Sequence, residues 1–191
     1  MSAEVKIVQD SSCSAIAELI FGNIRSYNKI VHLILGTGLG GTILETKNNI
    51  ITVSPIEPCG IIVDVPHGRK HNMCKTKGLL EAYVGGGSVE HFYDVTLSDI
   101  KDDNHIWDEI TDYLAVGINN INCIVKPQIV VIGGGIGLKR KNALAPVREK
   151  IKQYNELVAP PILTFTNVSG NSSLIGALAL FSLNNETTLF F

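Results

Sequence analysis

Two glycine-rich stretches, each following an apolar run, are the first candidates for chemistry. One extends from Gly36 to Gly41 in "LILGTGLGGTIL", and the other from Gly133 to Gly137 in "QIVVIGGGIG". A chain reversal needs only one or two glycines, and the backbone amides of such loops can bind phosphate oxygens. Neither stretch fits the Walker motif GxxxxGK[ST], and "GGGIG" does not fit the dinucleotide motif GxGxxG. Tight turns or close packing would explain either stretch alone, but two in one short chain favour nucleotide binding.

Two carboxylates stand where a ligand could bind. Asp10 follows residues 4–8, which alternate like a short strand, and precedes a predicted helix. Open α/β sheets gather ligand groups at such an edge. Asp10 could take a proton from an attacking hydroxyl, or it could only cap the helix. Glu81, in "GLLEAYVGGG", could accept hydrogen bonds from a polyol, or it could be a solvated residue of a first helical turn.

Four possible ligands of a soft metal fall close together: Cys59, His67, His71 and Cys74. Their spacing is not a common zinc pattern, so a polar loop with incidental histidines is the alternative. The other two cysteines, Cys13 and Cys123, lie in apolar helical surroundings and are predicted to be core residues.

The composition is that of a folded globular protein. The 191 residues are 45% hydrophobic and 18% charged, and the formal net charge is -2. This balance argues against a nucleic-acid binder that relies on a broad basic face. The first ten residues are polar rather than a secretory signal, and no apolar run approaches the length of a membrane span. A reduced, cytoplasmic protein that does not bind membranes is therefore expected.

Hydrophobic periodicity predicts the elements that must position these groups. Strands are expected at residues 4–8, 31–35, 41–44, 128–133 and 162–166, with further strand over 49–65 broken at Pro55 and Pro58. Helices are expected over 11–26 with Ser11 or Ser12 as cap, from about Gly78, and over 105–123, 143–154 and 172–183. Short apolar strands alternating with helices predict an α/β fold with mostly parallel, covered strands.

Five segments, taken in order, resemble the ROK family (repressor, open reading frame, kinase) of sugar kinases and related transcriptional repressors. "VQDSSCSAIAE" is similar to the family's "ENDANCAALAE", and "LGTGLGGTIL" to its phosphate loop "LGTGIGGGII". "GLLEAYVGG" resembles "GCLEAYxSG", whose glutamate contacts the sugar. "VGINNINCIVKPQIVVIGGGIG" is similar to the helix, proline and strand that lead into the family's "VIGGG" loop, and "SSLIGALAL" to its closing "GLIGAAALA".

The resemblance implies the α/β fold of the actin-like ATPase superfamily, in which two ribonuclease-H-like lobes enclose nucleotide and sugar. Residues 1–191 would form a single carboxyl-terminal lobe, with a mixed, mostly covered sheet flanked by helices. It also implies ATP and Mg²⁺ as cofactors. Asp10 would deprotonate the sugar hydroxyl that attacks the γ-phosphate, and Glu81 would contact the sugar. The residues expected to face the nucleotide are Gly36, Thr37, Gly38, Gly40, Gly133, Gly134 and Gly135.

The sequence departs from the family pattern at several positions. Family kinases begin with a DxGGT motif in a first lobe, which is expected to be missing because only "MSAEVKIVQ" precedes Asp10. The family's "GExGH" sugar and zinc segment reads "EPCGI", so Glu57 is a neighbour of the matching position and is kept as a substrate-binding candidate. The zinc motif CxCGxxGC reads "NMCKTKGL" and keeps only Cys74, so no family zinc site is expected.

These observations lead to three hypotheses. The first is a sugar kinase lobe that phosphorylates a hexose or N-acetylhexosamine and is impaired as a lone chain, because positioning supplies most of phosphoryl-transfer catalysis. The second is a non-catalytic sugar- or nucleotide-binding remnant or regulatory module. The third is one half of a split kinase. The expected partners are a sugar, a nucleotide and either further copies of the chain or a complementary lobe on another chain, but not nucleic acid.

Overall fold

The computed structural model describes residues 5–48, 50–65, 67–168, 171–182 and 188–190, which form a mixed sheet of six strands in the order β5-β4-β1-β2-β3-β6. The strands are β1 (Lys29–Leu35), β2 (Leu39–Lys47), β3 (Ile50–Ile56), β4 (Ile129–Gly133), β5 (Ile162–Phe165) and β6 (Thr188–Phe190). β1, β2 and β3 form an antiparallel meander, whereas β4 and β5 run parallel to β1 and β6 runs parallel to β3.

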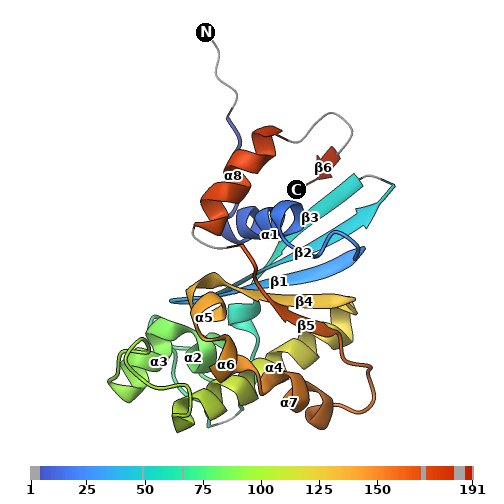
Figure 1. Cartoon of the computed structure of the whole chain (residues 1–191). Coiled ribbons are helices and arrows are strands. Elements are labelled where there is room, and N and C mark those ends of the chain that lie inside the picture. Colours follow the sequence, from blue (N-terminus) through green and yellow to red (C-terminus); the bar gives the residue numbers. More distant parts are fainter. Residues whose placement is uncertain (1–4, 49, 66, 169–170, 183–187, 191) are drawn as a thin grey trace.

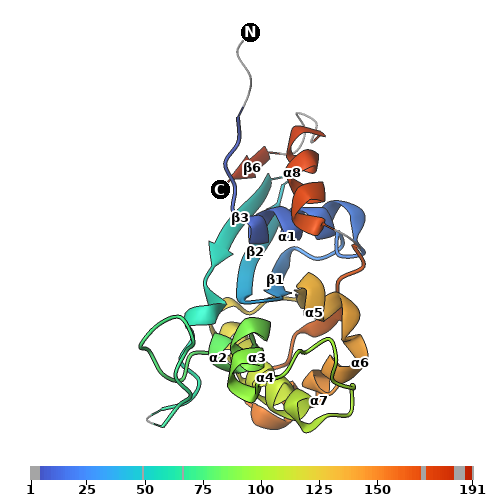
Figure 2. The ribbon, with the colours of Figure 1, turned by 90° about the vertical axis from the view of Figure 1, so that its left-hand side faces the viewer.

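Helices cover both faces of this sheet (Figure 1). One face packs against α1 (Asp10–Phe21) and α8 (Ser172–Ser182), which also pack against each other. The opposite face packs against α4 (His105–Val125), together with α2 (Glu81–Val84), α3 (Gly86–Tyr93), α6 (Lys141–Leu144) and α7 (Val147–Tyr154). Figure 2 shows the same two layers from the side. None of the helices in the described part of the chain has the length and apolar character needed to span a membrane.

The central strand β1 is buried on both faces, because each face of the strand packs into a separate hydrophobic core. Val31, Leu33 and Leu35 face the α4 layer, while Ile30 faces α1 and α8. His32 is also fully buried, and neither of its ring nitrogens has a hydrogen-bond partner among the described residues. Burial lowers the pKa of His32 to about 4, so the ring is neutral near pH 7.

The long periodic elements match the sequence prediction. The strands expected at 31–35, 41–44, 128–133 and 162–166 correspond to β1, β2, β4 and β5, and the helix expected over 105–123 is α4. The helix expected over 172–183 is α8, which extends to Ser182. Residue 183 lies outside the described residues. The α/β fold class with a mixed, covered sheet is confirmed.

The start of the chain differs from its prediction. Described residues 5–8 do not form a strand. Helix α1 begins at Asp10 with Gln9 as its N-cap, so neither Ser11 nor Ser12 caps it. Both serines face the sheet instead: Ser11 Oγ donates to the carbonyl of Gly41, and Ser12 Oγ forms a hydrogen bond with the Thr42 hydroxyl (3.3 Å each). The spacing of residues in the sequence could not show that these two serine side chains are buried against the sheet.

Several shorter elements also differ. Pro55 does not break β3: it lies in the strand opposite Thr42 of β2, and the described residues of β6 pair with residues 50–52 at the other edge. The turn η1 (Pro58–Gly60) follows β3. The helix expected from Gly78 begins at Glu81, and that expected over 143–154 is divided into α6 and α7. The second glycine stretch forms an unpredicted short helix, α5 (Gly134–Lys139), and Cys123 is exposed rather than a core residue.

Candidate active site

The first glycine stretch forms the turn between β1 and β2. Pairing continues to Leu35 and Leu39, and the Gly36 N–H donates to the Gly38 carbonyl (3.0 Å). The carbonyls of Gly36 and Thr37 accept hydrogen bonds from the first amides of α3, at 2.8 Å each. These bonds fix the tip of the hairpin against α3 and leave the Thr37 side chain exposed. Among the predicted glycines, Gly40 lies in β2 rather than in the turn.

The second glycine stretch lies beside this hairpin because β4 is the parallel neighbour of β1. Gly133 ends β4, and Gly134 has a φ of +79°, which favours glycine. A Cβ at Gly134 would lie 2.5 Å from the carbonyl oxygen of Leu35, so the chain passes closely over β1 here. Gly135 is exposed, and a Cβ built there would meet no other atom within 4 Å.

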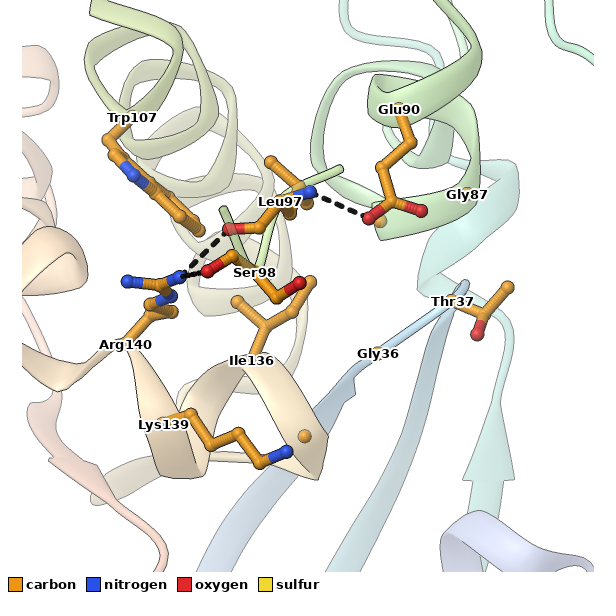
Figure 3. A pocket seen from close by; sticks show the side chains of 12 residues that line it. Gly36, Thr37, Gly87, Glu90, Leu97, Ser98, Trp107, Ile136, Lys139 and Arg140 are labelled. Carbon is orange, nitrogen blue, oxygen red and sulfur yellow. Dashed lines mark hydrogen bonds between the residues drawn. The ribbon is translucent and has the colours of Figure 1, made fainter. Parts of the chain in front are cut away.

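A pocket of about 410 Å³ joins the two glycine stretches (Figure 3). This volume is in the range of small-molecule sites. The hairpin, α3, the loop before α4, α4 itself and α5 with the residue after it all contribute to its wall. The lining residues are Gly36, Thr37, Gly86, Gly87, Glu90, Leu97, Ser98, Trp107, Gly135, Ile136, Lys139 and Arg140.

Charged side chains fix the loop that closes one side of this pocket. The Glu90 carboxylate accepts a hydrogen bond from the Leu97 N–H (2.7 Å). Arg140 donates to the carbonyls of Leu97 (2.9 Å) and Ser98 (2.7 Å), and it pairs with Asp102 (3.0 Å). Figure 3 shows the Arg140 guanidinium facing Trp107, whose ring centre is 5.7 Å away. The pocket therefore offers an aromatic and apolar wall together with groups of both charges.

Asp10 lies exposed at the first residue of α1, with Oδ1 accepting the Ser11 N–H (2.7 Å). The residue before it, Gln9, donates through Nε2 to Glu57 Oε1 (3.2 Å) just after β3. Glu57 is also exposed, and its other oxygen accepts the Cys59 thiol (3.5 Å). The beginning of α1 and the end of β3 therefore meet, which brings two predicted carboxylates to neighbouring elements.

Glu81 connects the hairpin to the segment before α2. Its Oε2 accepts the Leu39 N–H (2.7 Å), and its Oε1 accepts Nε2 of His71 (2.9 Å). The Glu81 side chain is only 20% exposed, so it is not a solvated residue of a first helical turn. Burial raises the pKa of the Cys59 thiol, and the charges of Glu81 and Glu57 raise it further. Cys59 is therefore within electrostatic reach of both carboxylates.

A model of the ROK family matches residues 1–183 of the chain. The chain belongs to the ROK family. It is 32% identical over 160 residues to an N-acetyl-D-glucosamine kinase of Yersinia pseudotuberculosis, covering 70% of this chain and 52% of the relative. It is 28% identical over 209 residues to a glucokinase of Thermotoga maritima, covering 90% of this chain and 66% of the relative. The chain thus spans about half to two thirds of the length of these curated relatives.

Solved ROK structures show the same fold. A ROK hexokinase from Thermus thermophilus superposes with a TM-score of 0.74 at 19% identity, covering 90% of this chain and 63% of that one. A ROK family glucokinase from Streptomyces griseus, in complex with glucose and AMPPNP, gives 0.70 at 19% identity, covering 91% and 67%. This chain therefore has the fold of these ROK structures.

The donors considered for a zinc ion do not converge in this ROK chain. His67 and Cys74 are exposed, Cys59 is bound to Glu57, and His71 is directed at Glu81. Within the described ranges, no three or more His, Cys, Asp or Glu side chains are grouped so that they could hold a metal ion. The residues present therefore do not fit the zinc of the family motif.

Sequence reasoning missed the residues that close the pocket: Glu90, Trp107, Lys139 and Arg140. Each comes from a segment with ordinary helical spacing or from a loop, so no local pattern distinguishes it. Trp107 carried one usable signal, because it is the single tryptophan of the chain. Its role in the pocket depends on packing between α3, α4 and α5.

Proposed function

We propose that this chain provides the nucleotide pocket and the substrate carboxylates of an ATP-dependent kinase for a hexose or N-acetylhexosamine. The observation that carries the proposal is the pocket that joins the glycine hairpin at Gly36 to the second glycine loop at Gly135. The relatives named N-acetyl-D-glucosamine kinase and glucokinase support the substrate class. Because the proposed reaction consumes ATP, we expect it to take place in the cytoplasm.

In this proposal the base of the nucleotide lies against the apolar wall of the pocket at Ile136, and its phosphates lie beside Gly36, Thr37 and Gly135. The amides and the Thr37 hydroxyl donate hydrogen bonds to phosphate oxygens. Mg²⁺, which accompanies ATP, neutralises phosphate charge when bound.

Asp10 acts as the general base. Its Oδ1 is held by the Ser11 N–H, so Oδ2 is free to accept the proton of a sugar hydroxyl. The hydroxyl oxygen forms a bond to the γ-phosphorus while the bond from that phosphorus to the bridging oxygen of ADP breaks. Glu81 and Glu57 accept hydrogen bonds from other sugar hydroxyls, because each carboxylate oxygen can accept more than one.

A complementary lobe, on another chain or in a further copy of this one, is part of the proposal. Phosphoryl transfer depends on positioning and on exclusion of water, yet Asp10 and Thr37 are exposed here. Leu174 and Phe181 are exposed large apolar side chains on α8 and support a covered surface. We therefore expect the lone chain to be impaired.

A second candidate function is sugar or nucleotide binding without catalysis. One observation favours it: both oxygens of Glu81 already accept hydrogen bonds from Leu39 and His71. A sugar would have to share these acceptors or displace one donor.

The deciding experiment measures ADP release from Mg-ATP with glucose, mannose, allose, N-acetylglucosamine and N-acetylmannosamine. The control is Asp10→Asn, which removes the base at an exposed position and should leave the melting temperature unchanged. Sugar-dependent turnover that falls by roughly 10²-fold or more in the variant supports the kinase. Turnover that is equal in both proteins refutes Asp10 as the base. Saturable binding of a sugar or nucleotide without turnover supports the second candidate.

A further inference from the structure

Residues 61–80 connect η1 to α2 with almost no regular structure. Among the described residues of this segment, 61–65 and 67–80, the sheet pairs are two isolated β-bridges, between Ile62 and Leu79 and between Lys70 and Lys77. Figure 2 shows the segment as an extended loop beside α2 and α3. An irregular segment of this length needs interactions from outside itself to keep one conformation.

The Arg69 side chain provides such interactions. It is only 7% exposed, and it reaches two helices at once. Nη2 donates to both carboxylate oxygens of Glu109 on α4 (2.8 Å each), and Nη1 donates to the Ala82 carbonyl in α2 (3.1 Å). The backbone N–H of Arg69 donates to the Tyr83 hydroxyl (2.6 Å). Removal of one partner of such a buried ion pair strongly destabilises the folded protein, because the other charge is left buried and unpaired.

Aromatic rings surround the same guanidinium. Its central carbon lies 3.5 Å from the ring centre of Phe92 and 4.7 Å from that of Tyr83. Tyr83 stacks on Tyr113 at 3.7 Å and donates its hydroxyl to Asp64 (2.5 Å). Burial, together with the bond to Asp64, raises the pKa of Tyr83 and keeps its hydroxyl a donor. Asp64, Arg69, Tyr83 and Glu109 are named the Arg69 cluster below.

The chain that leaves Arg69 carries His71 to Glu81. The His71 N–H donates to the Thr76 carbonyl (3.0 Å), which closes a narrow loop. Nδ1 of His71 accepts the Met73 N–H (3.2 Å), so the ring hydrogen of the neutral side chain is on Nε2. That hydrogen points to Glu81 Oε1 at 2.9 Å, and the position of His71 therefore depends on the loop.

We propose that Arg69 is a positioning residue: the Arg69 cluster holds residues 61–80 in place without a metal ion and thereby sets the contact of His71 with Glu81. The donor set in this segment does not fit zinc, whereas the cluster links the same segment to α2 and α4. The effect on sugar binding rests on the proposed function of Glu81. The effect on the order of residues 61–80 does not.

Hydrogen–deuterium exchange of the full chain tests the structural part. Arg69→Lys keeps the charge, but its single nitrogen cannot reach both Glu109 and the Ala82 carbonyl, and it loses the planar stacking on Phe92. We expect amides in 61–80 to exchange at least about tenfold faster and the melting temperature to fall by roughly 5 °C. The matched control Lys70→Ala, at an exposed neighbouring position, should behave like the wild type. Should Arg69→Lys fail to fold, Glu109→Gln keeps the shape and removes only the charge.

The zinc content of the purified protein tests the claim that no metal ion is needed. The purified wild type should show no stoichiometric zinc by elemental mass spectrometry, and EDTA should change neither exchange nor melting temperature. One bound zinc per chain whose removal frees residues 61–80 would overturn the proposal. Unchanged exchange in both Arg69→Lys and Glu109→Gln would overturn it as well.

The positioning role has its own signature at His71. In the wild type the ring ¹⁵N spectrum should report the Nε2–H tautomer, with His71→Gln assigning the signal. Arg69→Lys should lose this signature, and if the chain is a kinase it should raise the sugar KM more than it lowers kcat. An unchanged tautomer refutes positioning. If neither the wild type nor the variants bind a sugar, the proposed function fails, while the exchange and tautomer results still decide the role of Arg69.

Discussion

The two hydrogen bonds of Glu81 make its replacement by glutamine the most direct test of the site geometry. The carboxylate accepts the Leu39 N–H at 2.7 Å and Nε2 of His71 at 2.9 Å. Glutamine has one side-chain oxygen, so its amide nitrogen must face one of these two donors. Hydrogen bonds to charged groups contribute about 1.5–3 kcal/mol each, and partial exposure favours the lower part of that range. We expect Glu81→Gln to lose about 2 kcal/mol, which lowers the melting temperature by roughly 4–8 °C.

Urea and thermal unfolding at pH 7, followed by far-ultraviolet circular dichroism, measure this loss. The matched control is Glu57→Gln, because Glu57 is an exposed carboxylate whose contact to Gln9 is 3.2 Å long. It should change the free energy of unfolding by less than about 0.5 kcal/mol. Equal stability of Glu81→Gln and the wild type, or an equal loss in both variants, refutes the account of Glu81 as the connection between hairpin and loop.

Three further predictions concern the second glycine loop, the buried histidine and the pocket. Gly134→Ala should lose at least about 2 kcal/mol in denaturant titration, because its Cβ would meet the Leu35 carbonyl, whereas Gly135→Ala should lose less than about 0.5; equal losses contradict the geometry. The folded pKa of His32, about 4, lies below the unfolded value of 6.5, so the unfolded chain takes up the proton first and stability falls as pH drops from about 6.5 to 4. Between pH 7 and 4.5 this amounts to about 2 kcal/mol, and His32→Leu should remove that part of the pH dependence of urea unfolding; an unchanged dependence contradicts it. Mg-ATP should shift the emission of Trp107 saturably while Mg²⁺ with triphosphate alone should not, and an indifferent Trp107 counts against nucleotide in this pocket.

The parts of the fold that sequence could predict are those whose signal is long or repeated. The apolar positions of α4 recur at helical spacing, and Ile106, Ile110, Leu114 and Ile118 are all buried as expected. Short segments failed because their structure depends on a partner. Residues 5–8 alternate like a strand but do not form one, and the serines that follow Asp10 are buried by the sheet rather than used as caps.

In the candidate site, too, features with a local sequence signal were predictable and long-range contacts were not. Both glycine stretches were visible, because a local backbone need selects glycine at positions such as Gly134. The partners of Glu81 and Arg69 could not be found locally: Glu81 lies 42 residues from Leu39, and Arg69 lies 40 from Glu109. Folding alone brings these pairs together.

These long-range contacts also connect two observations that are separate in the sequence. The hairpin matches its family pattern closely, whereas the segment with the zinc motif does not. Glu81 bonds both, through Leu39 of the hairpin and His71 of residues 61–80. A displacement of the segment therefore reaches the hairpin through one side chain. For this reason the loss of the metal donors requires another means of fixing the segment if the hairpin is to keep its geometry, and Arg69 is placed to provide it.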